Sequence, residues 1–317
     1  MTPYDSILII AFGGPPKPED AYDYVKGIVG NRPGAEARIK EVAHHYELVG
    51  GSPFNKLTFE QADALKADLA GRGVTLPVLV GFRNWKPFVA ETVADMKARG
   101  LKRAIGVVLA PHSCFVSDEK YKLNVSDAVR DVYPELTVDY IDGFGRSYGY
   151  VKANADLARQ VIAGMGPERW EKTKLIFSAH SVPVNGCEPC SRKERTCPYP
   201  AHYAQTAKYV AEELGRPGDY LLAYQSRASM RTPWLEPDIG DSIREAAKGD
   251  WKEVLICPIG FLCDHVEVLY DLDHEARETC DGLSIGYNRV RTVQSHPKFV
   301  ETLADMVEAR YRMQTPV

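Results

Sequence analysis

The chain has 317 residues, of which 44% are hydrophobic and 26% are charged, and its formal net charge is −4 at pH 7. These values are ordinary for a globular protein and argue against an intrinsically disordered chain. Lys and Arg are mixed with Asp and Glu, without the basic stripe that marks a nucleic-acid-binding protein or a segment that binds anionic lipid.

Eight short apolar runs recur along the chain, and amphipathic stretches separate most of them. The runs cover residues 6–12, 76–82, 103–110, 136–141, 174–179, 220–224, 253–260 and 289–293. Several are nearly continuous Ile, Val and Leu, which is typical of strands covered on both faces. Stretches such as 88–99 and 202–214 are predicted helices. The alternation predicts βαβ units, and therefore parallel sheets flanked by helices.

The length suits two domains of about 150 residues each. The two halves also begin alike, because strand 6–12 and strand 174–179 each lead into a loop that contains proline. We therefore predict an α/β protein with two similar Rossmann-like or flavodoxin-like domains, at 1–148 and 149–317, each with a four-stranded parallel sheet. Ligands of such sheets bind beyond the carboxyl ends of the strands, which predicts a cleft between the domains.

The sequence shows no signal that would target the chain to a membrane or to the secretory pathway. The first residues lack a basic region, and the apolar run at 7–12 is too short for a signal peptide. No stretch approaches the 18 apolar residues typical of a membrane span. We expect a cytoplasmic protein.

Three of the seven cysteines lie close together in a polar loop, residues 185–199. They are Cys187, Cys190 and Cys197. An odd number of cysteines without a signal peptide argues against a disulfide framework. The loop has no apolar periodicity, so bound metal would give it a cross-link. Three interpretations stay open here: zinc, a 2Fe–2S cluster with a fourth thiolate from elsewhere, or loop cysteines without a shared role.

A histidine and an acidic segment each follow an apolar run. His180 ends the motif Ser178-Ala179-His180, a position where a structural hydrogen-bonded histidine is common. Asp264 and Glu267 have the spacing of a helix capping box. Acidic residues also recur at helical spacing, at positions 264, 267, 271 and 275. This row is either a solvated helix face or a route for protons or divalent cations.

Trp234 lies in a loop between Pro233 and Pro237, shortly after the strand that leads to Gln225-Ser226-Arg227. A tryptophan in a loop often covers the edge of a core. The alternative is that it contacts a flat aromatic ligand.

Five motifs, in this order along the chain, together resemble the ferrochelatase family. They are Phe12-Gly13-Gly14-Pro15, Gly81-Phe82-Arg83-Asn84, Ser178-Ala179-His180-Ser181, Gln225-Ser226-Arg227 with Trp234, and Pro258-Ile259-Gly260-Phe261 through Asp264-His265-x-Glu267. The resemblance runs from about residue 5 to residue 305. It implies the chelatase fold, with two four-stranded parallel α/β domains around a porphyrin cleft. It also implies that porphyrin and ferrous iron are the substrates.

The resemblance assigns roles to residues of the chain. His180 resembles the catalytic histidine, and Glu267 resembles the carboxylate that faces it across the macrocycle. Either side chain would also contact the substrate iron. The pocket positions implied by the resemblance are Phe12, Arg83, Asn84 and Trp234, with Ser226 and Ser52 near the propionates.

The resemblance also implies a fourth ligand for a 2Fe–2S cluster. His112-Ser113-Cys114 matches the remote ligand of cluster-bearing members, so the expected set is Cys114, Cys187, Cys190 and Cys197. Animal members carry three of these ligands in a C-terminal extension, so the internal position here departs from their pattern. Cys257, Cys263 and Cys280 are expected to be buried thiols.

Phe12 favours coproporphyrin III over protoporphyrin IX, because membrane-linked protoporphyrin enzymes tend to have an aliphatic residue there. Arg32, Ser52, Arg83 and Ser226 are candidate partners for the additional propionates. One alternative is a sirohydrochlorin-type cobalt chelatase, which lacks the Gln-Ser-x…Trp motif. Another is a haem or iron–sulfur sensor on the same fold. We expect a monomer or a homodimer.

Overall fold

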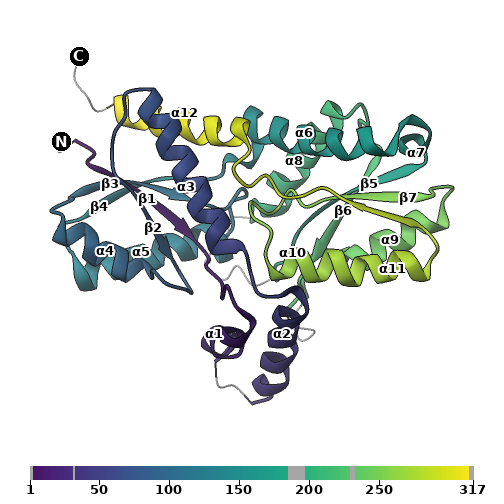
Figure 1. Cartoon of the computed structure of the whole chain (residues 1–317), viewed down its shortest axis with the longest axis horizontal. Helices are drawn as coiled ribbons and strands as arrows, with labels where there is room; N and C mark the ends of the chain where they lie inside the picture. The colour runs from purple at the N-terminus through teal and green to yellow at the C-terminus, as the bar shows by residue number, and fades with distance from the viewer. Residues whose placement is uncertain (1–2, 31–32, 185–196, 229–232, 314–317) are drawn as a thin grey trace. The chain divides into compact units, whose positions relative to one another are not determined.

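The computed structural model describes residues 3–30, 33–184, 197–228 and 233–313 (Figure 1). Its contacts divide the chain into two compact units. The first unit consists of Met1–Ala110, Ser117–Gly143 and Gln294–Val317, and the second of Pro111–Val116 and Phe144–Val293. The sequence predicts a single boundary after residue 148, whereas the observed division returns the C-terminal segment to the first unit.

A four-stranded parallel sheet forms the centre of the first unit, in the order β2-β1-β3-β4. The strands are β1 (Ser6–Ala11), β2 (Val78–Phe82), β3 (Arg103–Val108) and β4 (Thr137–Ile141). Every residue of β1 is buried, which explains its continuous apolar run. The central position of β1 is fixed by its register, since Ile7 pairs with Val78 on one side and Ile105 on the other.

Helices cover both faces of this sheet. Helices α4 (Val89–Ala98) and α5 (Lys120–Val132) pack on one face through a core that includes Leu8, Val93 and Val125. Helices α3 (Phe54–Gly71) and α12 (Pro297–Arg312) lie together on the opposite face (Figure 1). Helices α1 (Ala21–Val29) and α2 (Ala35–Val49) form a separate pair that packs together after β1.

The second unit repeats this plan with the sheet order β6-β5-β7-β8, again parallel throughout. Its strands are β5 (Thr173–His180), β6 (Tyr220–Gln225), β7 (Glu253–Cys257) and β8 (Gly286–Arg289). One face carries α9 (Ile239–Lys248), α10 (Val266–Tyr270) and α11 (Arg277–Gly282), and the other carries α6 (Tyr148–Met165) and α8 (Tyr199–Glu213) (Figure 1). The short helix α7 (Pro167–Glu171) follows α6. The predicted fold class is confirmed.

Seven of the eight predicted strands agree with the structure to within three residues at either end. The eighth, predicted at 289–293, is wrong, because β8 covers Gly286–Arg289. Among the described residues this strand pairs only with β7, and it is half-buried along its length, so it needs no continuous apolar run. The apolar signal came from Val290 and Val293, which are buried just beyond the strand.

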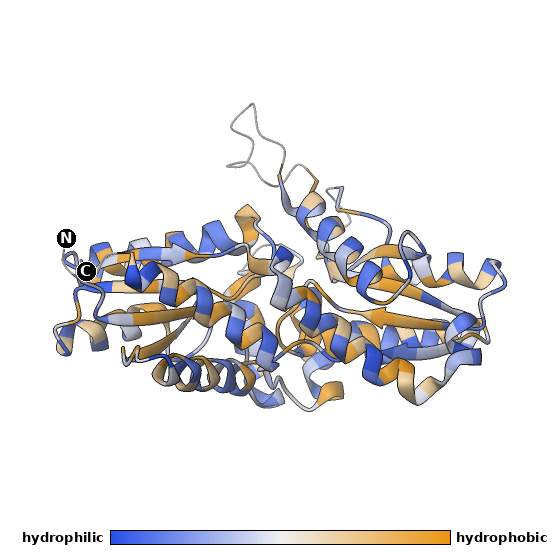
Figure 2. Ribbon diagram, turned by 90° about the horizontal axis from the view of Figure 1, so that it is seen from above, coloured by the Kyte–Doolittle hydropathy of each residue, from blue (hydrophilic) through white to orange (hydrophobic). Residues whose placement is uncertain are grey.

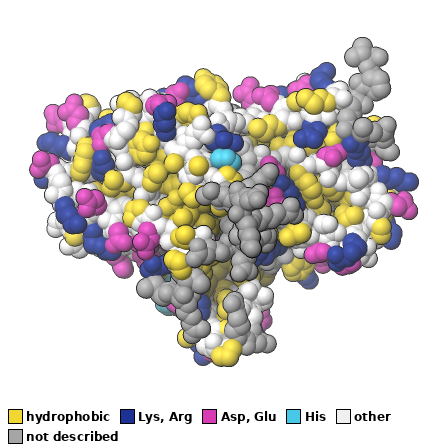
Figure 3. All heavy atoms as spheres, turned by 180° about the vertical axis from the view of Figure 1, so that it is seen from behind, with side chains coloured by type: hydrophobic (Ala, Val, Ile, Leu, Met, Phe, Trp, Pro, Cys, Tyr) yellow, Lys and Arg dark blue, Asp and Glu magenta, His cyan; other side chains and the backbone are white. Residues whose placement is uncertain are grey.

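Hydrophobic residues make up the strands, while the covering helices mix hydrophobic and hydrophilic residues (Figure 2). On the face drawn in Figure 3, acidic and basic side chains alternate with hydrophobic ones, without a field of a single sign. No helix in the described part of the chain is long and apolar enough to cross a membrane.

Candidate active site

The centre of the candidate site joins the end of β5 to the start of α10. His180 is the last residue of β5, and Glu267 is the second residue of α10. Nε2 of His180 lies 3.5 Å from Oε1 of Glu267, and the two side chains are 34% and 43% exposed. For a flat macrocycle to lie between them, these two atoms would have to be about 7 Å apart, which is two van der Waals contacts of about 3.5 Å. The expectation that Glu267 faces His180 across the macrocycle is therefore wrong, and the two groups form one cluster.

Gln225, the last residue of β6, braces this pair. Its side-chain oxygen accepts a 3.0 Å hydrogen bond from Ser178 Oγ, and its side-chain nitrogen donates to the carbonyl of Glu267 at 2.8 Å. Its backbone carbonyl accepts from Ser181 N at 2.8 Å. Gln225 is 1% exposed. The motif Gln225-Ser226-Arg227 thus contains a brace to which we assigned no role from the sequence.

Burial and the neighbouring polar groups have opposite effects on the pKa of His180. Burial by itself lowers the pKa of His180, because it disfavours the charged imidazolium. The Glu267 carboxylate, the carbonyl of Ser181 and the nearby Asp271 outweigh this effect and raise the pKa to about 9. His265 lies just before α10, and burial lowers its pKa, so His265 and His180 differ in protonation near neutral pH.

An acidic row continues from Glu267 along the helix. Asp271 begins the π-helical turn Asp271–Ala276 that follows α10, and such turns are frequent at functional sites. Asp271 accepts a hydrogen bond from the hydroxyl of Ser226, whose φ of 63° is uncommon for a residue other than glycine. Burial is the main cause that raises the pKa of Asp271 to about 8, and Glu267 and Glu275 add to it. The hydroxyl of Ser226 is thus engaged with an acid, and its contact with a propionate stays a prediction.

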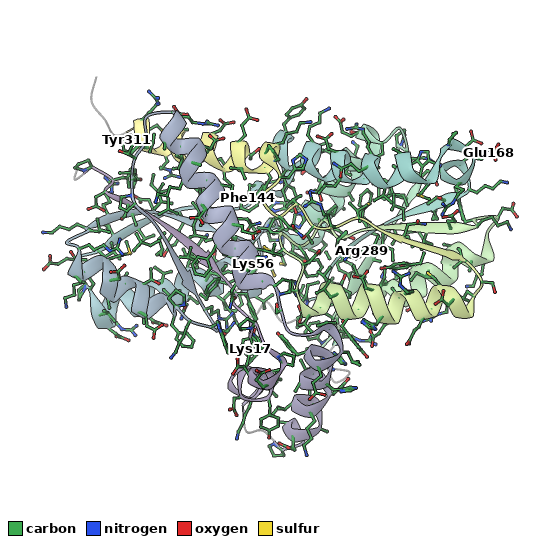
Figure 4. All side chains as sticks on the ribbon, in the orientation of Figure 1. Lys17, Lys56, Phe144, Glu168, Arg289 and Tyr311 are labelled. Atoms are coloured by element: carbon green, nitrogen blue, oxygen red, sulfur yellow. The ribbon has the colours of Figure 1, made fainter. Side chains whose placement is uncertain are left out.

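Asp264 belongs to a different arrangement. The expected capping box with Glu267 is wrong, since His265 precedes the helix and its Nδ1 accepts from Glu267 N at 3.3 Å. Asp264 lies 3.3 Å from Arg289, which also holds Asp273 through two hydrogen bonds of 2.7 Å. Arg289 lies beside the helix that begins with α10 (Figure 4). Asp264 is therefore tied to the edge strand and is not part of the acidic row.

The first unit carries further predicted pocket residues at the end of β1. The guanidinium carbon of Arg83 lies 6.0 Å from the centre of the Phe12 ring, a distance that permits a cation–π contact. The backbone nitrogens of Arg83 and Asn84 donate to the carbonyls of Ala11 and Phe12 at 2.9 Å, which joins the two loops. Gly13 has a φ of +79°, and a Cβ there would lie 2.8 Å from Phe82. Only glycine fits this turn without displacing its neighbours.

A pocket of about 460 Å³ opens beside these loops in the first unit. Its lining includes Tyr24, Ile28, Arg83, Asn84, Trp85 and Phe88. Nδ2 of Asn84 is buried and has no hydrogen-bond partner among the residues that the structure describes. A buried amide donor is normally satisfied, so this one indicates a place for a ligand.

Ser52 and Trp234 are fixed by backbone contacts of their loops. Ser52 is 5% exposed, and its Oγ accepts from Phe54 N at 3.3 Å. In the second unit, Trp234 forms a bridge with Pro183, which lies three residues after His180. Both stay predicted porphyrin contacts. Arg32 lies outside the described residues.

Two of the four expected cluster ligands lie side by side in the second unit. Sγ of Cys197 is 3.7 Å from Sγ of Cys114, which is too long for a disulfide. Two sulfurs held by one tetrahedral metal at about 2.3 Å lie about 3.8 Å apart, so the pair has a suitable spacing. Cys187 and Cys190 lie outside the described residues. Within the described ranges, no group of three or more His, Cys, Asp or Glu side chains is arranged to hold a metal ion.

The remaining cysteines are buried thiols, as predicted. They are Cys257, Cys263 and Cys280. Burial raises the pKa of the Cys257 thiol far above its usual range and that of Cys280 to about 12. Such thiols stay protonated and unreactive at neutral pH.

Sequence comparisons place the chain among proteins of one kind. A family model described as Ferrochelatase matches residues 4–311. A protein from Rhodopirellula baltica named ferrochelatase is 35% identical over 318 residues, which cover 98% of this chain and 87% of that protein. A Streptomyces coelicolor protein named coproporphyrin III ferrochelatase is 32% identical over 322 residues, covering 98% and 86%. A protein of the same name from Propionibacterium freudenreichii is 35% identical over 316 residues, covering 98% and 88%.

Solved structures share the architecture at low sequence identity. SirB from Bacillus subtilis with Fe³⁺ has a TM-score of 0.61 at 11% identity, and the match covers 98% of each chain. CbiX, described as the terminal enzyme for biosynthesis of siroheme in denitrifying bacteria, has a TM-score of 0.52 at 14% identity, covering 96% and 98%. At these identities the likeness concerns the fold alone, and it confirms the predicted chelatase fold.

Proposed function

Since this chain belongs to the ferrochelatase family, we propose that it inserts Fe²⁺ into a porphyrin with His180 and Glu267 as its reactive pair. Family membership makes the protein a lyase of haem biosynthesis that inserts a metal into a porphyrin. The observation that carries the assignment is the 3.5 Å contact of His180 Nε2 with Glu267 Oε1, at the carboxyl end of β5. Ligands of parallel sheets bind at that end of the strands.

The reaction removes two pyrrole protons and replaces the water shell of iron with four nitrogens. A neutral imidazole is suited to accept a pyrrole proton, so His180 is the base. Glu267 favours the protonated imidazole and can also hold the incoming cation through its oxygens. Asp271, with a pKa raised to about 8, continues the row toward the exposed Glu275. We assign this row to the passage of protons or of Fe²⁺.

The porphyrin is bound by the aromatic and polar residues described above. Phe12 and Trp234 supply flat apolar contacts, and binding energy of this kind can bend the macrocycle and expose its nitrogen lone pairs. Arg83 offers a guanidinium for a propionate, and the buried amide of Asn84 offers a further donor. Ser52 and Ser226 complete the proposed set.

Coproporphyrin III is the proposed substrate, with protoporphyrin IX as the alternative. Relatives from Streptomyces coelicolor and Propionibacterium freudenreichii carry the name coproporphyrin III ferrochelatase, and Phe12 favours the same type. Coproporphyrin has four propionates, and each charge-assisted contact contributes about 1.5–3 kcal/mol. One additional satisfied carboxylate therefore gives about tenfold discrimination or more.

An anaerobic metallation assay tests this assignment. The specificity constants for Fe²⁺ insertion are measured with both porphyrins in detergent-free buffer and again with low detergent, since protoporphyrin aggregates. We expect a higher value for coproporphyrin III under both conditions. A preference for protoporphyrin IX under both would overturn the substrate, and binding of both porphyrins without any insertion would favour the sensor or carrier hypothesis.

We also propose that Cys114, Cys187, Cys190 and Cys197 hold a 2Fe–2S cluster. The 3.7 Å spacing of Cys114 and Cys197 supports a shared metal, although zinc would fit it equally well. When bound, such a group supplies a redox-active cross-link for the loop 185–199. The test is the content of iron, acid-labile sulfide and zinc in freshly purified protein, with Cys280→Ser as the control. We expect iron and sulfide in the wild type and the control but not in Cys197→Ser; one zinc without sulfide would refute the cluster.

The competing hypotheses have less support. The fold is shared with SirB and CbiX, but the sequence matches lie with ferrochelatases over nearly the whole chain. A cytoplasmic location and a monomeric or homodimeric state stay predictions.

A further inference from the structure

Tyr199 lies between the thiol pair, Cys114 and Cys197, and the end of β5. It is the first residue of α8 and follows Cys197 by two positions. Its hydroxyl donates a 2.9 Å hydrogen bond to the backbone carbonyl of His180, and the residue is 6% exposed. A backbone carbonyl can only accept, so the Tyr199 phenol is the donor in this bond.

The segment that carries Cys114 is fastened to the same helix. The His112 ring packs edge-on against the ring of Tyr199, with centroids 6.0 Å apart. His112 Nε2 lies 3.0 Å from Thr206 Oγ1, and a Cβ at Gly145 would lie 2.8 Å from the His112 ring. This dense packing means that a displacement at the thiols is transmitted to the first turns of α8.

The hydroxyl of Tyr199 holds the peptide group that joins His180 to Ser181. The carbonyl of this peptide accepts from Tyr199, and its N–H donates to the backbone carbonyl of Gln225 at 2.8 Å. The next carbonyl, that of Ser181, contacts Nδ1 of the His180 ring. Rotation of the peptide therefore turns the imidazole relative to Glu267.

We propose that Tyr199 is a positioning residue that couples the Cys114–Cys197 thiol pair to His180. A metal or cluster held by the two sulfurs fixes Cys197 and, through Pro198, the start of α8. The Tyr199 hydroxyl then keeps the peptide after His180 in one orientation. Loss of the bound group loosens this contact and lowers turnover without weakening porphyrin binding. The inference rests on the proposed function only in taking His180 as the base.

The test compares Tyr199→Phe with Tyr203→Phe. Tyr203 lies one turn further along α8, is fully buried, and donates a 3.0 Å hydrogen bond to the carbonyl of Ala223 in β6. The control thus removes the same group from the same helix without touching His180. In the protein as purified, with its bound group and labelled histidine, the His180 ring resonance is assigned by its loss in His180→Gln. We expect Tyr199→Phe to move this resonance and Tyr203→Phe to leave it in place.

Turnover gives the second readout. Loss of one neutral hydrogen bond that positions the base should lower kcat roughly 3- to 10-fold, with the KM values for porphyrin and iron unchanged. Cys197→Ser should lower kcat in the presence of Tyr199 and change it less than about twofold in the Tyr199→Phe background, because coupled residues are not additive. Full multiplication of the two effects, or an equal shift of the His180 resonance in both tyrosine variants, would overturn the coupling. If the wild type inserted no iron, the proposed function would be refuted. The comparison of the His180 resonance in the two tyrosine variants would still decide whether Tyr199 positions His180.

Discussion

At the residue scale, His180 is held as an imidazolium until something displaces its proton. With a pKa near 9, most molecules carry the charged ring at pH 7. A divalent cation beside Glu267 disfavours that charge, and a histidine must lose its proton to bind metal. Under the proposed function, iron beside Glu267 would lower the pKa of His180 and so favour its role as the base.

Glu267→Gln should move the ascending limb of the pH–rate profile. Burial lowers the pKa of His180, and the Glu267 carboxylate is the largest of the influences that raise it, ahead of the Ser181 carbonyl and Asp271, so removal of Glu267 should lower that pKa. The specificity constant for iron reports the iron-free enzyme and rises as His180 loses its proton, which places the wild-type limb near pH 9 and the variant limb at clearly lower pH. Relative rates measured across pH 6 to 10 check this. Glu275→Gln, which changes an exposed carboxylate further along the row, serves as the control. An unmoved limb in Glu267→Gln would contradict the assignment.

Asp271→Asn should stabilise the fold at alkaline pH. The ordinary pKa of an aspartate, as in the unfolded chain, is 3.8. In the folded protein burial is the main cause that raises the pKa of Asp271 to about 8. Between these values the folded state binds more protons than the unfolded state, so wild-type stability falls as pH rises. Asparagine does not titrate, and its side-chain oxygen can still accept from Ser226. We expect a higher unfolding temperature than the wild type at pH 8 and a smaller difference at pH 5. Equal differences at the two pH values would show that Asp271 is not the titrating group.

At the element scale, the edge strand β8 anchors the start of the helix that carries Glu267. Arg289, its last residue, reaches Asp264 before α10 and Asp273 in the π-helical turn. The side chains of Arg289 and Asp264 are only 12% and 14% exposed. The position of the Glu267 carboxylate thus depends on a largely buried ion cluster.

Arg289→Met should therefore cost stability and activity together. Removing one partner of a buried ion pair leaves the other charges uncompensated, at a cost of about 3–5 kcal/mol. Arg277→Met is the control, because Arg277 is exposed and contacts the Tyr287 ring at 4.3 Å, a contact with a contribution of about 0.5–1 kcal/mol. Chemical unfolding of the two variants provides the comparison. Equal losses would mean that the cluster is only a surface network.

Elements with a continuous apolar run could be predicted from the sequence, and elements held by polar contacts could not. β1 and β7 are central strands whose residues are almost all buried, so their composition marks them. β8 is held by its register with β7 and by Arg289, which leaves no apolar pattern. The π-helical turn at Asp271 also has no composition of its own, and the spacing of the acidic residues predicted only an ordinary helix face there.

At the scale of the whole molecule, the chain returns to close the first unit. Helix α12 buries Phe299, Val300, Leu303 and Val307, and Arg72 in α3 pairs with Asp305 and Glu308. The packing of α12 against α3 could not be predicted from the sequence, because a contact over more than 200 residues leaves no local pattern.

Deletion of residues 294–317 should unfold the first unit. Four buried side chains, at about 1.5–3 kcal/mol each, approach the entire stability of a typical domain. We expect an aggregated or molten product, judged by near-UV circular dichroism and gel filtration. Deletion of 314–317 alone is the control, since Met313 is already 81% exposed. A native-like truncated protein would show that α12 does not belong to this core.

The residues of the candidate site could be named from the sequence, but their mutual arrangement could not. The resemblance identified His180 and Glu267, yet it placed them on opposite sides of the macrocycle, and the structure has them in contact. Ser226, which is predicted to contact a propionate, donates to Asp271, a bond that the sequence does not indicate. Tyr199 carries no signal beyond its place after Cys197, because a side-chain bond to a backbone carbonyl is invisible in composition.

The most direct test of the account is the turnover of His180→Ala. As the base that removes pyrrole protons, His180 should contribute roughly 100-fold or more to kcat for Fe²⁺ insertion. Porphyrin affinity, measured by quenching of protein fluorescence, should change little, because the aromatic contacts remain. His274→Ala, an exposed histidine stacked on Tyr270 in the same helical segment, should behave like the wild type. A His180→Ala variant that retains near-normal turnover would contradict the central claim.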